Sequence, residues 1–461
     1  MDQPTPPDFN ALGRLAGEIV DAEALAGRDP GIDKENFGAG LAVRPKNTDD
    51  IVAILGWCRD NGYSIVPQGG RTGLAGGAAS RERQLILMLD RMDRIVEIDP
   101  AGSVAIVEAG VTLEALDNAL SGHGLCAGID LAARGSCTIG GMVSTNAGGL
   151  EAFRNGIMRN RVLGLEAVMA DGTVMSDMKR VTKANEGYDI KQLLIGAEGT
   201  LGIVTKVVLK LEPATSGEST ALVSVDSAAS AVTLFQRLRK QLGDRLLAME
   251  IMWRNYFDTA ARQLGQDRIA DTVDAPACVI VEIGSDNPDD LLALLAEAAE
   301  DGEILDALIA KNDSERNDIW QIREDSWAID RAYPHGYWFD VSVPHARLDA
   351  YVTHCTEQLA DIDPDMKFFA FGHLGDGNLH ITISKGVPTK GLYNRLARIL
   401  FEDLLKSGGS FSAEHGIGTE KKHALDVYGD PGKLAVMRSI KRLLDPHNIM
   451  NPGKVIESVA E

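Results

Sequence analysis

The sequence predicts a mixed protein of helices and strands, folded as about two or three domains. Its 461 residues are too many for one small hydrophobic core. Segments with apolar residues at helical spacing alternate along the chain with short strand-like segments, and glycine-rich loops follow several of these strands. The alternation by itself fits either a parallel sheet or an α+β arrangement, so pattern alone leaves that choice open.

The first part of the chain contains one clear amphipathic helix and a series of strands. At residues 48–61 apolar side chains recur at helical spacing, and Asp49 and Asp50 suit a first helical turn. Asp171-Gly172 is typical of a hairpin turn between two strands. We therefore expect helices at 48–61 and 112–120, and strands at 63–67, 84–90, 104–110, 162–170, 173–176 and 202–211.

A domain boundary is expected near residues 213–217, where the sequence Pro-Ala-Thr-Ser-Gly consists of small and turn-forming residues. Gly375-Asp376-Gly377 predicts a tight hairpin, and the last turn-rich segment is expected to return to the first domain. The predicted domains are therefore 1–215 (core about 42–213), 216–440 and 441–461. Beyond the boundary we expect strands at 219–226, 277–284, 367–372 and 378–384, and helices at 228–242 and 289–300.

The charge balance argues against nucleic acid and anionic membrane as partners. Lys and Arg number 46 against 67 Asp and Glu, a formal net charge of −21. Binding to phosphate-rich polymers requires a basic footprint, which this composition does not provide. An anionic substrate must therefore be attracted by local positive charge.

The cysteines and the start of the chain predict a cytoplasmic protein. No apolar run approaches the ~20 residues that a membrane-spanning helix needs, and residues 1–7 lack the features of a signal peptide. The cysteines are odd in number and scattered, with no CxxC pattern, so reduced thiols are expected. They are Cys58, Cys126, Cys137, Cys278 and Cys355.

Three glycine-rich segments, at 67–77, 135–149 and 196–204, predict a diphosphate cofactor. Their backbone N–H groups can hold a diphosphate, with Arg71 and Thr72 adding side-chain contacts. Each alone could be an ordinary turn, but three in one domain are harder to dismiss. Neither a GxGxxG fingerprint after a strand nor a P-loop is present, which weakens NAD(P) binding and nucleotide hydrolysis as interpretations. FAD remains.

The histidines near the C-terminus predict an open metal site. A tight hairpin would bring His373 and His380 to one end, and Glu414 can add an oxygen ligand. Two histidines and one carboxylate leave coordination positions open, which suits catalytic Zn or a non-haem Fe or Mn ion. His415 directly follows Glu414 and can move a proton beside the metal. At this point a hydrolase or an oxygenase would fit equally.

Together with residues 162–172, the glycine segments resemble the PCMH-type FAD-binding domain of the vanillyl-alcohol oxidase superfamily, over residues 42–213. Residues 373–380, Glu414-His415 and 451–454 are similar to C-terminal signatures of FAD-dependent D-2-hydroxy acid dehydrogenases, the D-lactate and D-2-hydroxyglutarate group. The resemblance implies an α+β fold: a two-part FAD-binding domain plus a substrate domain with a ferredoxin-like antiparallel sheet covered by helices. It also implies non-covalent FAD, in agreement with the absence of His or Cys from the first glycine loop.

The resemblance also implies which residues contact FAD. They are Pro67, Gln68, Gly69, Gly70, Arg71, Thr72, Gly73, Gly76, Gly77, Ser136, Gly140, Gly141, Ser144, Thr145, Asn146, Gly148, Gly149, Glu198, Gly199, Gly202, Ile203 and Asn451.

The chemistry implied by the resemblance is oxidation of a D-2-hydroxy acid to the 2-oxo acid. It assigns His373, His380 and Glu414 as ligands of a metal, normally zinc, and His415 as the base that deprotonates the metal-bound hydroxyl while hydride passes to flavin N5. Arg323 resembles the family's arginine element and is the candidate partner of the substrate carboxylate.

The rest of the substrate pocket departs from the 2-hydroxyglutarate dehydrogenase pattern. Where those enzymes commonly carry a threonine, a lysine and an asparagine, this chain has Trp327, Trp338 and Thr382. An indole in place of a lysine removes a partner for a distal carboxylate, so D-lactate or a larger apolar D-2-hydroxy acid is favoured. The alternatives are a D-2-hydroxyglutarate dehydrogenase, an oxygen-using flavin oxidase, and a non-catalytic FAD-binding subunit.

The resemblance implies an electron-transfer flavoprotein or a quinone-linked carrier as electron acceptor. A homodimer is expected on general grounds.

Overall fold

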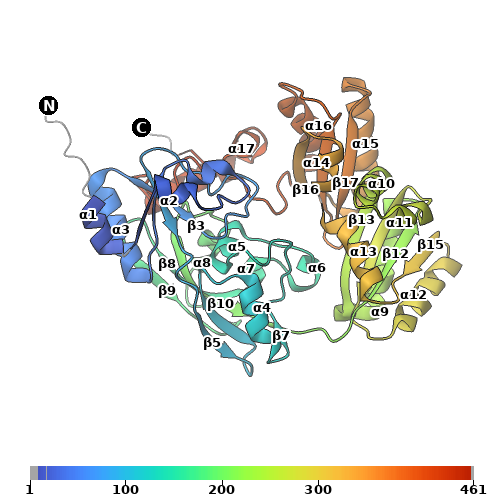
Figure 1. Ribbon diagram of the computed structural model, residues 1–461, viewed down its shortest axis with the longest axis horizontal. Coiled ribbons are helices and arrows are strands. Elements are labelled where there is room, and N and C mark those ends of the chain that lie inside the picture. Colours follow the sequence, from blue (N-terminus) through green and yellow to red (C-terminus); the bar gives the residue numbers. More distant parts are fainter. Residues whose placement is uncertain (1–8, 17, 326, 458–461) are drawn as a thin grey trace. The chain divides into compact units, whose positions relative to one another are not determined.

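The computed structural model describes residues 9–16, 18–325 and 327–457, and the chain divides into two compact units. Unit 1 comprises Met1–Gly149, Asn155–Ala214 and Glu414–Glu461, and unit 2 comprises Leu150–Arg154 and Thr215–Ala413. Helices and mostly antiparallel sheets are combined in both units, which confirms the predicted α+β class (Figure 1).

The first sheet of unit 1 has four strands in the order β1-β2-β4-β3. Its inner strand β4 pairs in parallel with β2 and β3, and all five of its residues are buried, as expected for a strand covered on both faces. Helix α3 buries Ile51, Ile54 and Leu55 in the same core. The elements are α1 (Phe9–Ala16), β1 (Ile19–Asp21), α2 (Ala22–Ala26), β2 (Leu41–Val43), α3 (Thr48–Asn61), β3 (Ser64–Gln68) and β4 (Gln84–Met88).

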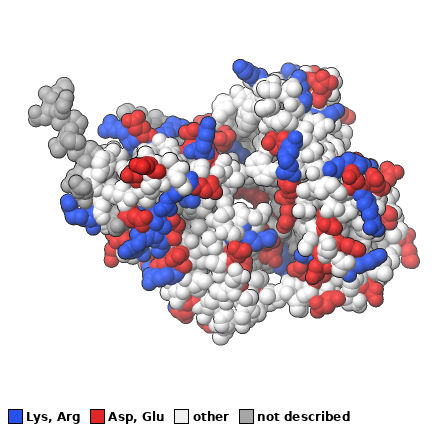
Figure 2. Space-filling view, in the orientation of Figure 1, with Lys and Arg blue, Asp and Glu red and all other residues white. Residues whose placement is uncertain are grey.

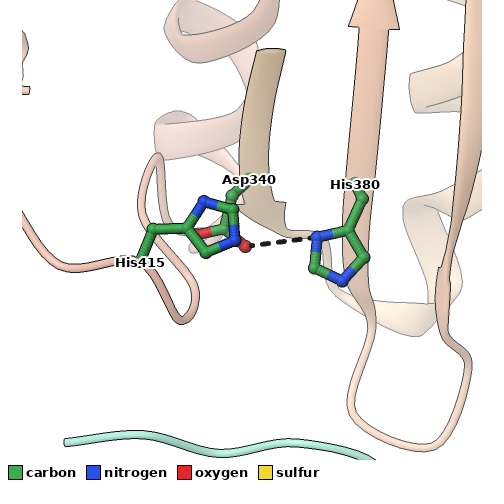
Figure 3. A group of neighbouring side chains, drawn as sticks. All are labelled: Asp340, His380 and His415. Atoms are coloured by element: carbon green, nitrogen blue, oxygen red, sulfur yellow. Dashed lines mark ion pairs between the residues drawn. The ribbon is translucent and has the colours of Figure 1, made fainter. Parts of the chain in front are cut away.

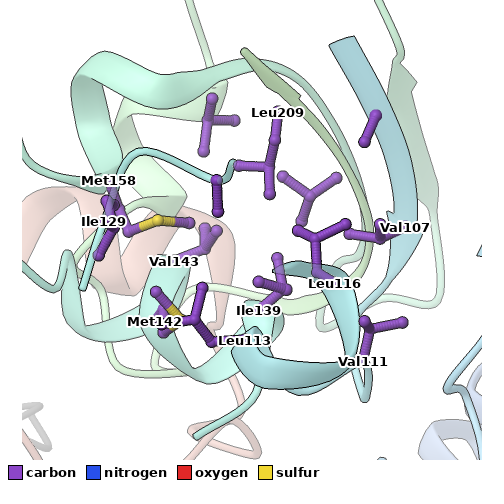
Figure 4. Close-up of a cluster of buried hydrophobic side chains, with 14 of the residues drawn as sticks. Val107, Val111, Leu113, Leu116, Ile129, Ile139, Met142, Val143, Met158 and Leu209 are labelled. Atoms are coloured by element: carbon purple, nitrogen blue, oxygen red, sulfur yellow. The ribbon is translucent and has the colours of Figure 1, made fainter. Parts of the chain in front are cut away.

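The second sheet of unit 1 has five antiparallel strands in the order β5-β6-β10-β8-β9. Apolar residues from its strands pack with those of α4 and α5 in one buried cluster (Figure 4). The strands are β5 (Ile95–Asp99), β6 (Val104–Glu108), β8 (Val162–Val168), β9 (Val174–Asp177) and β10 (Ile203–Lys210), with a separate short pair β7 (Leu125–Cys126) and β11 (Glu212–Pro213). The helices are α4 (Leu113–Ser121), α5 (Ile139–Thr145), α7 (Met158–Arg161), α8 (Lys191–Leu194), α17 (Lys422–Tyr428) and α18 (Pro431–Leu444).

Unit 2 is built on a seven-stranded antiparallel sheet in the order β15-β12-β14-β13-β17-β18-β16. The strands are β12 (Ser219–Val225), β13 (Leu246–Trp253), β14 (Ala277–Ile283), β15 (Asp306–Ile309), β16 (Tyr337–Ser342), β17 (Lys367–His373) and β18 (Asn378–Ser384). The longer helices are α9 (Ala228–Leu242), α10 (Arg254–Gln263), α12 (Pro288–Glu300), α13 (Asp313–Glu324), α15 (Leu348–Ile362) and α16 (Tyr393–Lys406). Short helices are α11 (Asp267–Thr272) and α14 (Trp327–Ala332), and α6 (Ala152–Asn155) spans a unit boundary.

Most predicted elements are confirmed, some to the residue. The helices at 48–61 and 228–242 and the strand at 378–384 have the predicted bounds, and both predicted hairpins are antiparallel pairs. A parallel sheet in unit 2, which the sequence pattern left open, is wrong. The pattern also missed β13, β16 and α13, which carry residues of the site described below.

The cysteines are all free, and four of the five are buried. Burial raises the pKa of the Cys58 thiol to about 12 and that of Cys137 to about 11, so neither is a ready nucleophile. On the face shown in Figure 2, acidic and basic side chains are interspersed over both units. Among the described residues, no helix is both long and apolar enough to cross a bilayer.

Candidate active site

The first two glycine loops of unit 1 approach each other so closely that only glycine fits. A Cβ on Gly69 would lie 2.2 Å from Thr138 Oγ1, and one on Gly70 would lie 1.8 Å from the Ser136 carbonyl oxygen. Glycine therefore permits the backbone-to-backbone approach, which a cradle of main-chain donors needs.

Glu198, in the third glycine loop, orders the segment that follows His415. Its carboxylate accepts hydrogen bonds from the backbone N–H groups of Ile417 (2.7 Å) and Gly418 (2.9 Å), all within unit 1. Burial raises the pKa of Glu198 above its usual range, while these two N–H donors act in the opposite direction. The side chain predicted to contact FAD thus also fixes the Glu414–Gly418 segment.

Asn451 connects the C-terminal segment to two of the glycine loops. Its Nδ2 donates to the carbonyl oxygens of Gly77 (3.0 Å) and Glu198 (2.7 Å). These contacts lie within unit 1, as do all the residues predicted to contact FAD.

Three buried polar atoms at these loops have no hydrogen-bond partner among the residues that the structure describes. They are Gln68 Oε1, Arg71 Nε and Asn451 Oδ1. Because buried polar atoms are normally paired, their clustering on predicted FAD contacts fits a bound polar group. The residues present therefore fit FAD.

In unit 2, strand register places two histidines and two carboxylates on one face of the sheet. Glu250 on β13 lies opposite His373 on β17, and Asp340 on β16 lies opposite His380 on β18. Residues directly opposite each other in antiparallel strands share a face, and Phe371, two residues before His373, lies opposite His380. The two imidazole rings have centroids 5.4 Å apart. The predicted histidine pair is thus brought together.

Each histidine directs its Nδ1 atom at its own buried carboxylate. Glu250 Oε1 lies 2.9 Å from His373 Nδ1, and Asp340 Oδ1 lies 3.9 Å from His380 Nδ1 (Figure 3). A carboxylate only accepts hydrogen bonds, so the contact with Glu250 places the ring hydrogen of His373 on Nδ1. Its Nε2 atom then carries the lone pair that a metal would bind.

Arg323, the predicted partner of a substrate carboxylate, lies beside the same histidine. Its Nε donates to Glu250 Oε2 at 2.8 Å, and its guanidinium carbon lies 4.7 Å from the centroid of the Phe371 ring. Nη2 is 2.7 Å from Glu250 Oε2 but lacks hydrogen-bond geometry, so this buried donor has no hydrogen-bond partner within the described part of the chain. A donor of this kind fits an anionic ligand.

The three residues predicted to surround the substrate tail also come together in unit 2. Trp338 on β16 lies opposite Thr382 on β18, and the rings of Trp327 and Trp338 have centroids 4.8 Å apart. Trp338 and Thr382 lie two residues from Asp340 and His380, on the same face of the sheet. Trp327 is 45% and Trp338 37% exposed, so they are open to a ligand rather than part of the core.

Glu414 and His415, the remaining predicted ligand and the predicted base, begin the last segment of unit 1. Glu414 Oε1 accepts a hydrogen bond of 2.6 Å from the Gly149 N–H, in the second glycine loop. The residue before Glu414 is anchored in unit 2, where the Ala413 N–H donates to Asp340 Oδ2 at 3.1 Å. Covalent connection therefore keeps the Glu414 backbone within about 4 Å of a residue bound to the histidine strands. His415 is the next residue along the chain after Glu414, and Figure 3 labels it.

Sequence reasoning missed Glu250 and Asp340 as site residues. Both carboxylates are almost fully buried, at 1% and 0% exposure. The available signal was an acidic residue inside an otherwise apolar strand, as in Leu246–Trp253, because acidic side chains are rarely buried without a partner.

Comparison with known proteins gives a consistent result over most of the chain. A model of FAD linked oxidases, C-terminal domain, matches residues 215–455, and a model of an FAD binding domain matches residues 39–177. A mitochondrial D-2-hydroxyglutarate dehydrogenase from Arabidopsis thaliana is 37% identical, over 97% of this chain and 81% of that protein. A putative mitochondrial D-lactate dehydrogenase from Schizosaccharomyces pombe is 33% identical, over 90% of this chain and 81% of that protein.

Solved structures agree on the fold. Substrate-bound p-cresol methylhydroxylase superposes with a TM-score of 0.73 at 17% identity, covering 99% of this chain and 98% of that one. At this identity the similarity shows the fold alone.

The predicted cytoplasmic location is wrong by these comparisons, because several relatives, including those from Arabidopsis thaliana and Bos taurus, are named mitochondrial. The prediction depended on residues 1–7 and on scattered cysteines without a CxxC pattern, and reduced cysteines do not distinguish the cytoplasm from the mitochondrion.

The comparisons and the observed fold together decide the family. The identity extends over both units, and the matched models cover the first two glycine loops and the histidine strands. The chain belongs to the family of FAD-dependent D-2-hydroxyglutarate and D-lactate dehydrogenases, within the vanillyl-alcohol oxidase superfamily, and is an FAD-dependent oxidoreductase.

Proposed function

We propose that this protein oxidises a D-2-hydroxy acid to the 2-oxo acid, using non-covalent FAD and a divalent metal, normally zinc. The observation that carries the proposal is the arrangement on one face of the unit 2 sheet. There, Glu250 contacts Nδ1 of His373, and the buried Nη2 of Arg323 has no hydrogen-bond partner among the described residues. When bound, FAD would supply the hydride acceptor, and a metal held by His373, His380 and Glu414 would supply a Lewis acid.

Arg323 binds the substrate carboxylate in this proposal. Its guanidinium is buried, positively charged and held in place by Glu250, so it is pre-organised for a planar anion. It supplies the local positive charge that an anionic substrate needs in a chain of net charge −21.

His415 accepts the proton of the substrate hydroxyl on an imidazole nitrogen. The lone pair on a neutral imidazole nitrogen can take a proton from a hydroxyl within hydrogen-bond reach. The support is positional: His415 directly follows the proposed ligand Glu414, and Glu198 fixes the backbone immediately beyond it.

The substrate tail is proposed to be apolar. The paired Trp327 and Trp338 offer apolar surface and no positive charge for a second carboxylate. D-2-hydroxyglutarate is the second candidate, because the relative from Arabidopsis thaliana is named for it.

The electron acceptor is proposed to be an electron-transfer flavoprotein or a quinone-linked carrier. Anaerobic reduction by substrate, followed by exposure to air, separates this from an oxygen-using oxidase. Rapid re-oxidation by air would contradict the proposal.

A panel of D- and L-2-hydroxy acids, assayed with an artificial acceptor with and without a chelator, tests the function. We expect turnover of D acids only, and loss of activity on chelation that added zinc restores. His415→Ala is expected to lower kcat by about 10²–10⁴-fold, as for loss of a general base. The control is His354→Ala, a partly exposed histidine on α15. Full activity of His415→Ala would refute its role.

A further inference from the structure

Glu250 joins two residues of the proposed site that lie in different elements. One carboxylate oxygen contacts His373 Nδ1 at 2.9 Å, and the other accepts a hydrogen bond from Arg323 Nε at 2.8 Å. The side chain is 1% exposed, so solvent does not compete for these contacts. The same carboxylate therefore holds a proposed metal ligand and the proposed carboxylate partner.

Strand register places Glu250 where it can do this. It lies directly opposite His373 in the β13–β17 pair, and the side chains share the face on which Arg323 of α13 packs. The neighbouring strand β14 carries a similar buried carboxylate, Glu282, which also binds α13. Glu282 contacts Arg316, Trp320 and Thr220. Glu250 and Glu282 are thus both buried acids that bind α13, and Glu250 also contacts a site histidine.

We propose that Glu250 is a positioning residue that fixes His373 as the Nδ1–H tautomer, which places the ring lone pair on Nε2, and at the same time fixes the direction of the Arg323 guanidinium. This inference rests on the proposed function, because it concerns the metal ligand and the substrate partner of that site. Hydrogen bonds of this kind to ligating histidines commonly change metal affinity by about 10–100-fold.

Glu250→Gln gives a result that a merely structural role would not produce. The amide oxygen will face Arg323, a donor, so the amide NH₂ must face His373 and needs Nδ1 as an acceptor. The ring hydrogen then moves to Nε2, where it blocks metal binding. Although glutamine has the shape of glutamate, we expect Glu250→Gln to weaken zinc binding by about 10–100-fold, and by more than Glu250→Ala.

The experiment uses the full-length FAD-loaded chain. Zinc affinity is measured by competition with a chromophoric chelator, and thermal melting reports folding. Glu282→Gln is the matched control, since it removes a buried carboxylate bound to the same helix but not to a histidine. We expect it to lower the melting temperature and to leave zinc affinity unchanged. Equal zinc affinity of Glu250→Gln and wild type, or a milder effect of Gln than of Ala, would overturn the inference.

Nitrogen-15 NMR of the histidine rings in metal-free protein separates the failure of this inference from the failure of the proposed function. The His373 signals of the wild type should show the Nδ1–H tautomer, and those of Glu250→Gln the Nε2–H tautomer. If the wild type bound no zinc, the metal in the proposed function would be wrong, while these signals would still support the role of Glu250. Unchanged His373 signals in Glu250→Gln would overturn that role.

Discussion

The two units form their candidate sites by different means. In unit 1 the backbones of the glycine loops approach within distances that no Cβ allows, and three buried polar atoms there have no hydrogen-bond partner among the described residues. Unit 2 uses side chains on one face of a sheet, where register sets Glu250 opposite His373 and Asp340 opposite His380. The first kind of site depends on local sequence, and the second depends on which distant strands pair.

The largest effect is expected when the backbone approach in unit 1 is broken. In Gly70→Ala the new Cβ would lie 1.8 Å from the Ser136 carbonyl oxygen, so one of the two loops must move. We expect loss of bound FAD, read from flavin absorbance per chain, and destabilisation by about 3 kcal/mol or more, at the upper end of overpacking effects. Gly122→Ala, outside the glycine loops, is the stability control, since its Cβ meets no atom within 4 Å. Equal melting temperatures of the two variants would contradict this account.

This difference between the units explains what the sequence could predict. The glycine loops and the histidine hairpin are short, continuous segments, so their residue types and spacing are visible in the sequence. The contact between Glu250 and His373 joins residues 123 positions apart, and it requires β13 to pair with β17. β13 is an almost continuous apolar run, which does not show alternation and was not assigned. Half of the unit 2 site therefore required the three-dimensional structure.

A second test concerns the buried side chain of Lys454, which contacts the chain just after the first glycine loop. Lys454 is 3% exposed, and its Nζ donates to the Ala79 carbonyl oxygen at 2.6 Å. Burial, with the nearby Arg81 and Lys422 charges, lowers the pKa of Lys454 to about 8, although Glu198 and Asp33 act in the opposite direction.

In FAD-free protein this pKa makes stability depend on pH. Between about pH 8 and the unfolded value of ~10.4, the unfolded chain binds more protons, so the free energy of unfolding rises with pH. Lys454→Met removes this contribution. We expect the difference in unfolding free energy, wild type minus variant, to rise by up to about 3 kcal/mol across this window, measured by urea unfolding. The exposed Lys240→Met controls for loss of a lysine as such. A difference independent of pH would contradict the low pKa.

The smallest effect, a change in substrate preference, tests the side-chain site of unit 2. Trp338 lies opposite Thr382 and two residues from Asp340, which places it beside the proposed substrate site. Trp338→Lys puts an ammonium group where a distal carboxylate would lie. We expect kcat/KM for D-2-hydroxyglutarate, relative to D-lactate, to rise about tenfold, the scale of one new charged contact near solvent.

Trp338→Gln separates the added charge from the lost ring, because it removes the indole without adding a cation. If the lysine variant alone gains activity on D-2-hydroxyglutarate, charge at this position selects the tail, as the apolar-tail proposal requires. If both variants lose activity equally on every acid, Trp338 only supports the sheet. A wild type that already prefers D-2-hydroxyglutarate would show that a positive group elsewhere holds the distal carboxylate. The two exposed indoles would then not decide specificity, and groups outside this sheet face would recognise the tail.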